Sequence, residues 1–121
     1  TKIRNSAFYD CSKLALTSLP AELTIIGNSA FYGCSNLALT SLPAGLTSIE
    51  ASAFYDCSKL ALTSLPAGSI TFEGTPTSIH SSSFEGCTNL TTINVPWSEG
   101  EVANAPWGAT NATINYNYTG E

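Results

Sequence analysis

The stretch that decides the fold is SAFYDCSKLALTSLPA at Ser6–Ala21, because the chain repeats it at a regular interval. Ser52–Ala67 repeats it residue for residue, and Ser29–Ala44 departs from it at only two places. A looser fourth copy, SSFEGCTNLTTINVP, runs from Ser82 to Pro96. Repeats with a period of about 20–50 residues are typical of solenoids, in which each coil buries its apolar side only against neighbouring coils.

The spacing of the cysteines measures the period. They lie 23, 23 and 30 residues apart, at Cys11, Cys34, Cys57 and Cys87. Within a coil, apolar residues at i, i+4, i+5, i+8 and i+11, counted from Ile26, predict one or two helical turns. The LALTSLP segment that follows predicts a short strand that ends at proline, because proline cannot donate to a sheet ladder. Stacked coils would align these strands in a parallel sheet with a spacing of about 4.8 Å.

The fixed positions of one coil form a longer motif. In the second coil they are Ile26-Gly27, Ala30-Phe31, Cys34, Leu37 and Leu42-Pro43. Over about residues 3–96 this pattern resembles the BspA-like leucine-rich repeat, also called the Treponema pallidum type, with the approximate signature I-G-x-x-A-F-x-x-C-x-x-L-x-x-I-x-I-P. The resemblance implies an α/β solenoid, a right-handed coil with a short parallel sheet on one face and short helical turns on the other. It also implies binding or adhesion, since such arrays are typical of long bacterial surface or secreted proteins and occur in protist and phage proteins. The family carries no catalytic motif.

The strand of the first three coils departs from the family pattern, which places apolar residues three, six and eight positions after the cysteine. The fourth coil obeys it, at Leu90, Ile93 and Val95. The others hold threonine at the middle place, at Thr17, Thr40 and Thr63. A leucine precedes each threonine, at Leu16, Leu39 and Leu62. Either these leucines form an exposed apolar ladder, or the strand shifts and buries them behind a bulge. Burial stabilises by about 2 kcal/mol per leucine and favours the shift, but a bulge also costs ladder bonds.

An insertion lengthens the third coil at about residues 67–77. Ile70 and Phe72 alternate there with polar residues, as in a strand. Because only three residues separate this segment from the preceding LTSLP, a parallel crossover between the two is excluded. We therefore expect either a hairpin or a strand or loop on the other face of the coil, and favour the latter.

The chain is predicted to be one solenoid of two parts, with four coils of about 23 residues over 1–96 and a capping segment over 97–121. Strict alternation in ATINYNY predicts a final strand at about 112–118. Adding the 23-residue period to Ile93 and Val95 reaches two tyrosines of this strand, Tyr116 and Tyr118.

The two ends look different. Trp97 and Trp107 are interpreted as a cover for the open end of the core or, alternatively, as an aromatic platform for a sugar ring or a partner. At the other end, the chain begins inside a coil, with Ile3 at the repeat's isoleucine position. Since solenoids need polar caps, we expect an exposed apolar edge there and a chain cut from a longer array.

Composition limits the function. Four Lys and Arg against nine Asp and Glu give a net charge of -5, so binding of nucleic acid through a basic stripe is not expected. No apolar run approaches the roughly 18 residues of a membrane span. The single histidine, His80, has no predicted partners for catalysis, and cysteines spaced one per coil form a ladder rather than a metal site. We predict no catalytic residue, cofactor or metal, and buried, reduced cysteines.

The outward residues are copied from coil to coil, which suits a repetitive ligand bound by avidity or a spacer without a ligand. The predicted function is a non-catalytic protein- or glycan-binding module of a bacterial surface, secreted or phage-borne protein; the alternative is a structural spacer or assembly element. The partner would be an extracellular protein or glycan, with self-association possible through the N-terminal coil. The candidate binding surface comprises Leu16, Ser18, Leu39, Ser41, Leu62, Ser64, Asn94, Tyr9, Tyr32, Tyr55, Trp97 and Trp107.

Overall fold

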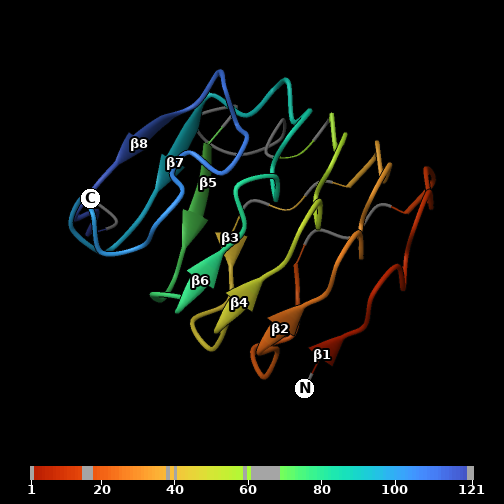
Figure 1. Cartoon of the computed structure of the whole chain (residues 1–121), viewed down its shortest axis with the longest axis horizontal. Coiled ribbons are helices and arrows are strands. Elements are labelled where there is room, and N and C mark those ends of the chain that lie inside the picture. Colours follow the sequence, from red (N-terminus) through yellow and green to blue (C-terminus); the bar gives the residue numbers. More distant parts are fainter. Residues whose placement is uncertain are drawn as a thin grey trace.

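The computed structural model describes residues 2–14, 18–37, 39, 41–58, 60 and 69–119, and it contains two four-stranded parallel sheets. Sheet A consists of β1 (Lys2–Ile3), β2 (Ile25–Ile26), β4 (Ser48–Ile49) and β6 (Ser78–Ile79). Sheet B consists of β3 (Ser41–Leu42), β5 (Ser69–Phe72), β7 (Thr92–Asn94) and β8 (Thr113–Asn115). Figure 1 shows both rows of strands crossing a stack of coils, with the chain termini toward opposite ends of the stack.

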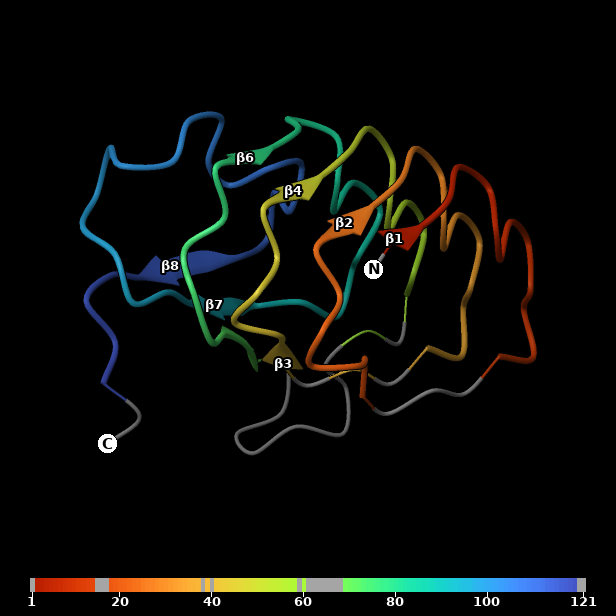
Figure 2. The same ribbon diagram turned by 90° about the horizontal axis from the view of Figure 1, so that it is seen from below.

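Sheet A is built on the first isoleucine of the repeat, and the sequence analysis missed it by predicting a single sheet. The register aligns Ile3 with Ile26, Ile26 with Ile49, and Ile49 with Ile79. The last three of these side chains are at most 1% exposed. Each strand of sheet A is only two residues long, so it is too short to show an alternation of apolar and polar residues in the sequence. The second sheet therefore comes from pairing between coils rather than from a strand pattern within a coil. Figure 2 shows the two rows as separate bands.

The predicted helical turns are wrong, since no helix occurs within the described ranges. Backbone N–H groups after sheet A alternate between two partners: Ala30 and Tyr32 donate to carbonyls three residues back, whereas Ser29 and Phe31 donate to the next coil. Positive φ angles at Ser29 (56°) and Gly33 (74°) interrupt any helical run every four residues. The apolar spacing therefore belongs to tandem turns, whose remaining hydrogen bonds join neighbouring coils.

The insertion lies in sheet B, which corrects the expected hairpin or outer strand. β5 pairs in parallel with β3 on one side and with β7 on the other. Leu42 aligns with Phe72, and Ile70 aligns with Ile93, so SITF takes the strand position of the third coil. The extra length of that coil falls earlier, between Leu60 and Ser69, in residues that the structure mostly leaves undescribed. The copied LALTSLP of the third repeat lies there, so its expected strand is outside the described residues.

Columns of identical side chains fill the core. The phenylalanine rings stack along the axis with centroids 5.2–5.4 Å apart, at Phe8, Phe31, Phe54 and Phe84. Beside them, the Cys34, Cys57 and Cys87 thiols each donate to a phenylalanine carbonyl of the preceding coil, at 3.0–3.1 Å. These three cysteines are buried and unbridged, whereas Cys11, also unbridged, is exposed. Burial raises the pKa of the Cys57 thiol and raises that of Cys87 to about 12. The cysteine ladder is thus a packing element for three of its four members.

The C-terminal segment closes the core. β8 lies inside the stretch for which a final strand is predicted, but it pairs with β7 at an offset of 21 residues, aligning Ile114 rather than Tyr116 with Ile93. The shorter offset reflects an irregular last coil, VPWSEGEVANAPWGA, that is not a copy of the repeat. Trp97 and Trp107 pack edge to face, with centroids 6.0 Å apart, over the end of the aromatic core.

Candidate binding surface

Four predicted surface residues are buried. Leu39 and Trp107 are 0% exposed, Trp97 is 3% and Asn94 is 6%. Leu39 therefore follows the second of the two strand arrangements, in which the extra leucine turns inward. The tryptophans cover the core and are not an open aromatic platform, and the Asn94 amide bonds to neighbouring strands, donating to Thr71 and accepting from Asn115. These four side chains are withdrawn from the candidate surface.

The serine row of the candidate surface is only partly described. Ser18 is exposed and Ser41 is half-buried, and both line a shallow hollow that Glu73 also borders. The remaining predicted residues, Leu16, Leu62 and Ser64, lie outside the described residues. The structure thus places two serines of this row at one hollow.

The tyrosine row forms a regular ladder. The rings of Tyr9, Tyr32 and Tyr55 stack with centroids 4.7 Å apart and interplanar angles of 9° and 6°. Packing between its neighbours raises the pKa of the Tyr32 phenol through desolvation first and through the adjacent phenols next. Because the inner ring faces lie against one another, the ladder presents mainly edges and hydroxyls, and Tyr9, at 51% exposed, is the most open of the three rings. A sugar ring therefore has no row of platforms here.

The coils differ most on the outer face of sheet A. We define the sheet A face as the residue before and the residue after each inward isoleucine, namely Lys2, Arg4, Ile25, Gly27, Ser48, Glu50, Ser78 and His80. The first coil presents two cations there, the second an isoleucine and a glycine, the third a serine and a carboxylate, and the fourth a serine and an imidazole. The first three coils are near copies over Ser6–Ala21, Ser29–Ala44 and Ser52–Ala67, so the variation on this face contrasts with the copied segment.

A first hollow on this face lies over Gly27, between Lys2 and Arg4 on one side and Glu50 on the other. Gly27 cannot carry a side chain, because a Cβ there would lie 2.6 Å from Asn5 Oδ1 and 2.7 Å from the Asn5 nitrogen. The hollow is therefore enforced by the close approach of the first two coils. This hollow lies between the positive charges of Lys2 and Arg4 and the negative charge of Glu50.

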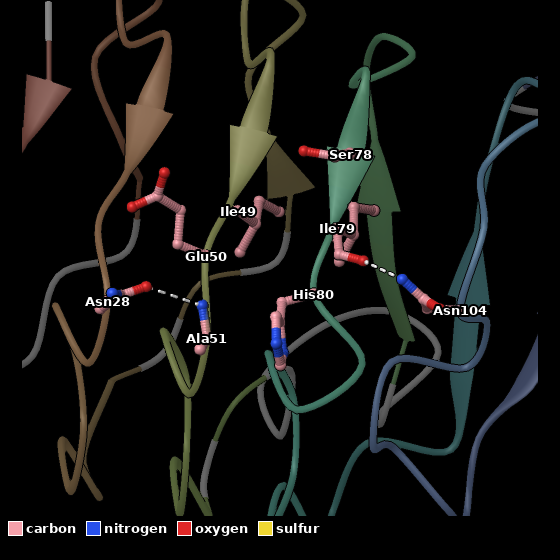
Figure 3. A pocket seen from close by; sticks show the side chains of 8 residues that line it. All are labelled: Asn28, Ile49, Glu50, Ala51, Ser78, Ile79, His80 and Asn104. Atoms are coloured by element: carbon pink, nitrogen blue, oxygen red, sulfur yellow. Dashed lines mark hydrogen bonds between the residues drawn. The ribbon is translucent and has the colours of Figure 1, made fainter.

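A second hollow lies where a ladder of asparagines stops (Figure 3). Asn5 Oδ1 accepts from the Asn28 nitrogen at 2.9 Å, and Asn28 Oδ1 accepts from the Ala51 nitrogen at 3.1 Å. Ala51 has only a methyl group, so no third amide continues the ladder. His80 and Asn104 border the gap from the far side, as Figure 3 shows.

The imidazole of His80 is engaged locally. Its Nδ1 accepts a hydrogen bond from the Ser82 nitrogen at 3.1 Å and lies 3.0 Å from the Ser82 hydroxyl. The Ser82 hydroxyl also accepts from the Ser52 nitrogen at 3.1 Å. This serine is therefore held by the turn, and the His80 edge that faces solvent offers its other ring nitrogen. The arrangement suits hydrogen bonding to a ligand, with amide, imidazole and carboxylate groups in a row.

Sequence reasoning missed the sheet A face because it looked for copied residues. Aligning the coils on Ile3, Ile26, Ile49 and Ile79 would have shown a column in which all four residues differ, Arg4, Gly27, Glu50 and His80. The described residues hold no group of three or more Asp, Glu, His or Cys side chains positioned to bind a metal ion. Within the same ranges, no helix has the length and apolar character needed to cross a bilayer.

Comparisons with known proteins place these features in a wider context. Residues 1–98 match a family model described as "BspA type Leucine rich repeat region (6 copies)". The crystal structure of a T. pallidum leucine-rich repeat protein is similar over 98% of this chain, with a TM-score of 0.57 and 25% sequence identity. The match covers 63% of that protein, so the chain spans less than two thirds of its length. No curated protein matches the chain.

Proposed function

Because the chain belongs to the BspA-type leucine-rich repeat family, we propose that it is a non-catalytic module that binds a protein or a glycan through the sheet A face. Repeat modules of this type are typically surface binding domains. The observation that carries the proposal is the contrast between copied coils and the four different residues at the column of Arg4, Gly27, Glu50 and His80. A surface that reads one partner needs different groups at successive positions.

Two further features support the proposal. The sheet A face combines charged, amide and imidazole groups with two hollows, which provides both polar contacts and shape. The tyrosine ladder, in contrast, uses its ring faces for packing within the molecule. The sheet A face is therefore the better candidate of the two.

Proteins of this family are often surface-associated. We extend this to an extracellular or bacterial cell-surface location, or to a virion, with an extracellular protein or glycan as the partner. Self-association through the N-terminal coil, possible from the sequence, is not part of the proposal, because the open carbonyls of the first coil meet no free donor at Trp107 or Ala109 of a second copy, whose N–H groups bond within the last coil.

A binding screen with matched variants tests the proposal. The chain is applied to a glycan array and to a panel of extracellular proteins, together with the triple variant Arg4→Ala, Glu50→Ala, His80→Ala. A control variant changes three exposed charged residues away from the face, Lys13→Ala, Glu22→Ala and Glu73→Ala. We expect signals that the face variant loses and the control keeps, with both variants folded by circular dichroism. Equal loss in both variants, or no signal with a folded chain, would contradict the proposal.

A spacer is the second candidate, and the aromatic columns favour it. Stacked rings of phenylalanine and tyrosine, together with thiol and amide bonds between coils, tie each coil to the next. Such a rod holds other parts of a protein apart without a ligand of its own. The spacer predicts that the screen gives nothing and that substitutions on the sheet A face are neutral in every assay.

A further inference from the structure

We propose that the sheet A face binds an extended polypeptide segment that carries an acidic residue and, three residues away, a basic residue. The segment would lie along the solenoid axis, with its carboxylate at Lys2 and Arg4 and its cation at Glu50. This inference rests on the proposed function and names the partner class and its charge pattern.

Among the residues that the structure describes, the charges on the face are separated and have no ion-pair partner. Lys2 and Arg4 are exposed in the first coil, and Glu50 is half-buried two coils away. In the part of the chain that the structure describes, the Glu50 carboxylate makes no hydrogen bond or ion pair, while its backbone nitrogen and oxygen are both bonded. Gly27 lies between the two charged sites, packed against Asn5, and adds no side chain of its own to the hollow. A ligand that bridges this hollow meets a positive site first and a negative site second.

The distance between the two sites selects the spacing in the ligand. Arg4 and Glu50 occupy the same column two strands apart, which is about 9.6 Å at the usual strand spacing. A polyproline II segment rises about 3.1 Å per residue and repeats every three residues, so residues i and i+3 lie on one side about 9.3 Å apart. In a β-strand, residues i and i+3 point to opposite sides. The match therefore favours a polyproline II segment with charges at i and i+3.

The neutral groups of the face also suit a polypeptide. Ile25 is half-buried beside the hollow and offers apolar contact. Asn28 uses its Oδ1 for Ala51, which leaves its amide N–H groups to donate to the backbone carbonyls of a ligand. The backbone of a polyproline II segment makes no internal hydrogen bonds and needs such donors. The sheet A face holds no Phe, Tyr or Trp, the side chains on which sugar rings usually stack.

Immobilised peptides test the inference on the whole chain. The peptide Ac-PPEPPKPP-NH2 carries the proposed charge pattern, and the comparison peptides replace its charged pair by Glu/Glu, Lys/Lys or Gln/Gln. A fourth comparison, Ac-PPPEKPPP-NH2, places the two charges next to each other. Binding is followed by surface plasmon resonance at low ionic strength. We expect Ac-PPEPPKPP-NH2 to bind about fivefold more tightly than any comparison peptide, the scale of two exposed ion pairs.

A charge reversal sharpens the test. Glu50→Lys makes the face positive along its length and should shift the preference to the Glu/Glu peptide by about fivefold. Glu73→Lys makes the same charge change beside sheet B, and this variant should keep the peptide preference of the unmodified chain. Equal binding of all peptides, or a preference that follows Glu73→Lys as closely as Glu50→Lys, would overturn the inference. If no peptide binds while glycan signals are lost in the sheet A face variant, the proposed function stands and the ligand is a glycan. If neither peptides nor the screen give a signal, both proposals fail.

Discussion

The first and last coils of this solenoid end the same core in opposite ways. In the first coil, the residues at core positions are half-buried, namely Ile3, Phe8, Leu14 and Leu19. Their counterparts in the second coil are fully buried, namely Ile26, Phe31, Leu37 and Leu42. At the other end, the last coil places Trp107 at 0% and Trp97 at 3% exposure. In this chain the copied first coil leaves its core residues half-buried, whereas the last coil buries both tryptophans and leaves Ile114 half-buried.

The backbone shows the same asymmetry. Inside the stack, each coil donates N–H groups to the next, as Phe8 does to Ala30 and Phe54 does to Ser83. The matching carbonyls of the first coil, on Asn5, Ala7 and Tyr9, accept no hydrogen bond from any residue that the structure describes. In the last coil, Trp107 and Ala109 donate within the coil, to Asn104 and Pro106, as Tyr9 and Cys11 do to Ser6 and Phe8 in the first coil. The asymmetry of the backbone therefore lies in the unused carbonyls of the first coil.

The largest effect should come from opening the closed end. Trp107→Ala removes a fully buried ring that contacts Phe72 and Trp97, and we expect a loss of about 3–5 kcal/mol in the free energy of unfolding. Phe8→Ala, at the open end, should cost only about 1–2 kcal/mol, because that ring is only partly buried. Urea unfolding measures both. Equal losses at the two ends would break the comparison.

The second largest difference should be in the reactivity of the thiols, between Cys11 of the first coil and Cys87 of the fourth. Cys11 is exposed, whereas Cys87 is buried, and burial raises the pKa of the Cys87 thiol to about 12. At pH 8 the thiolate fraction of Cys87 is then about a thousandfold below that of an ordinary thiol. Alkylation with iodoacetamide, followed by peptide mass spectrometry, should label Cys11 first and Cys87 only after unfolding, with the Cys87 rate rising as the pH rises. Rapid labelling of Cys87 in the folded chain would contradict its burial.

The period and the family motif could be predicted from sequence because they are local facts of spacing. The parallel sheet of the LALTSLP position was predicted, and β3 and β7 lie in it. The second sheet could not be, because the two residues of each sheet A strand carry no alternation and pair only with the next coil. The helical turns were mispredicted because one apolar spacing fits both a helix and tandem turns; the positive φ angles of Ser29 and Gly33 decide between them.

The expected place of the insertion was wrong, and four residues of the candidate surface are buried, for a related reason. Ile70 and Phe72 were placed by their distance from the copied LTSLP, but their segment pairs with β3 and β7 in sheet B, and both side chains are buried in the core. The candidate surface was sought among copied residues such as Leu39, which the core takes up. The variable column of Arg4, Gly27, Glu50 and His80 was visible in the sequence, but its exposure follows only from sheet A.

The exchange rates of backbone amide hydrogens should differ from coil to coil along the stack. The Phe8 and Phe54 amides both donate to the next coil, yet the Phe8 bond belongs to a coil that packs on one side only. We expect the Phe8 amide to exchange about 100-fold faster than that of Phe54, because end units open at lower free energy. The Phe84 amide, which donates to Trp107 in the closing coil, should exchange at a rate near that of Phe54. A Phe84 amide as fast as Phe8 would mean that the last coil does not close the stack.

The smallest effect concerns contact between two molecules. The open carbonyls of the first coil need N–H donors, and the last coil of a second copy directs those of Trp107 and Ala109 inward. A contact between two first coils would place carbonyl acceptors opposite carbonyl acceptors, and Lys2 and Arg4 opposite the same residues of the second copy. We therefore expect a dissociation constant above about 1 mM both for this contact and for that between a first and a last coil. Analytical ultracentrifugation should show a monomer across the accessible concentrations. If a dimer formed, Phe8→Ser would distinguish its origin: loss of the dimer would place the contact on the first coil and would show that apolar exposure outweighs the missing donors.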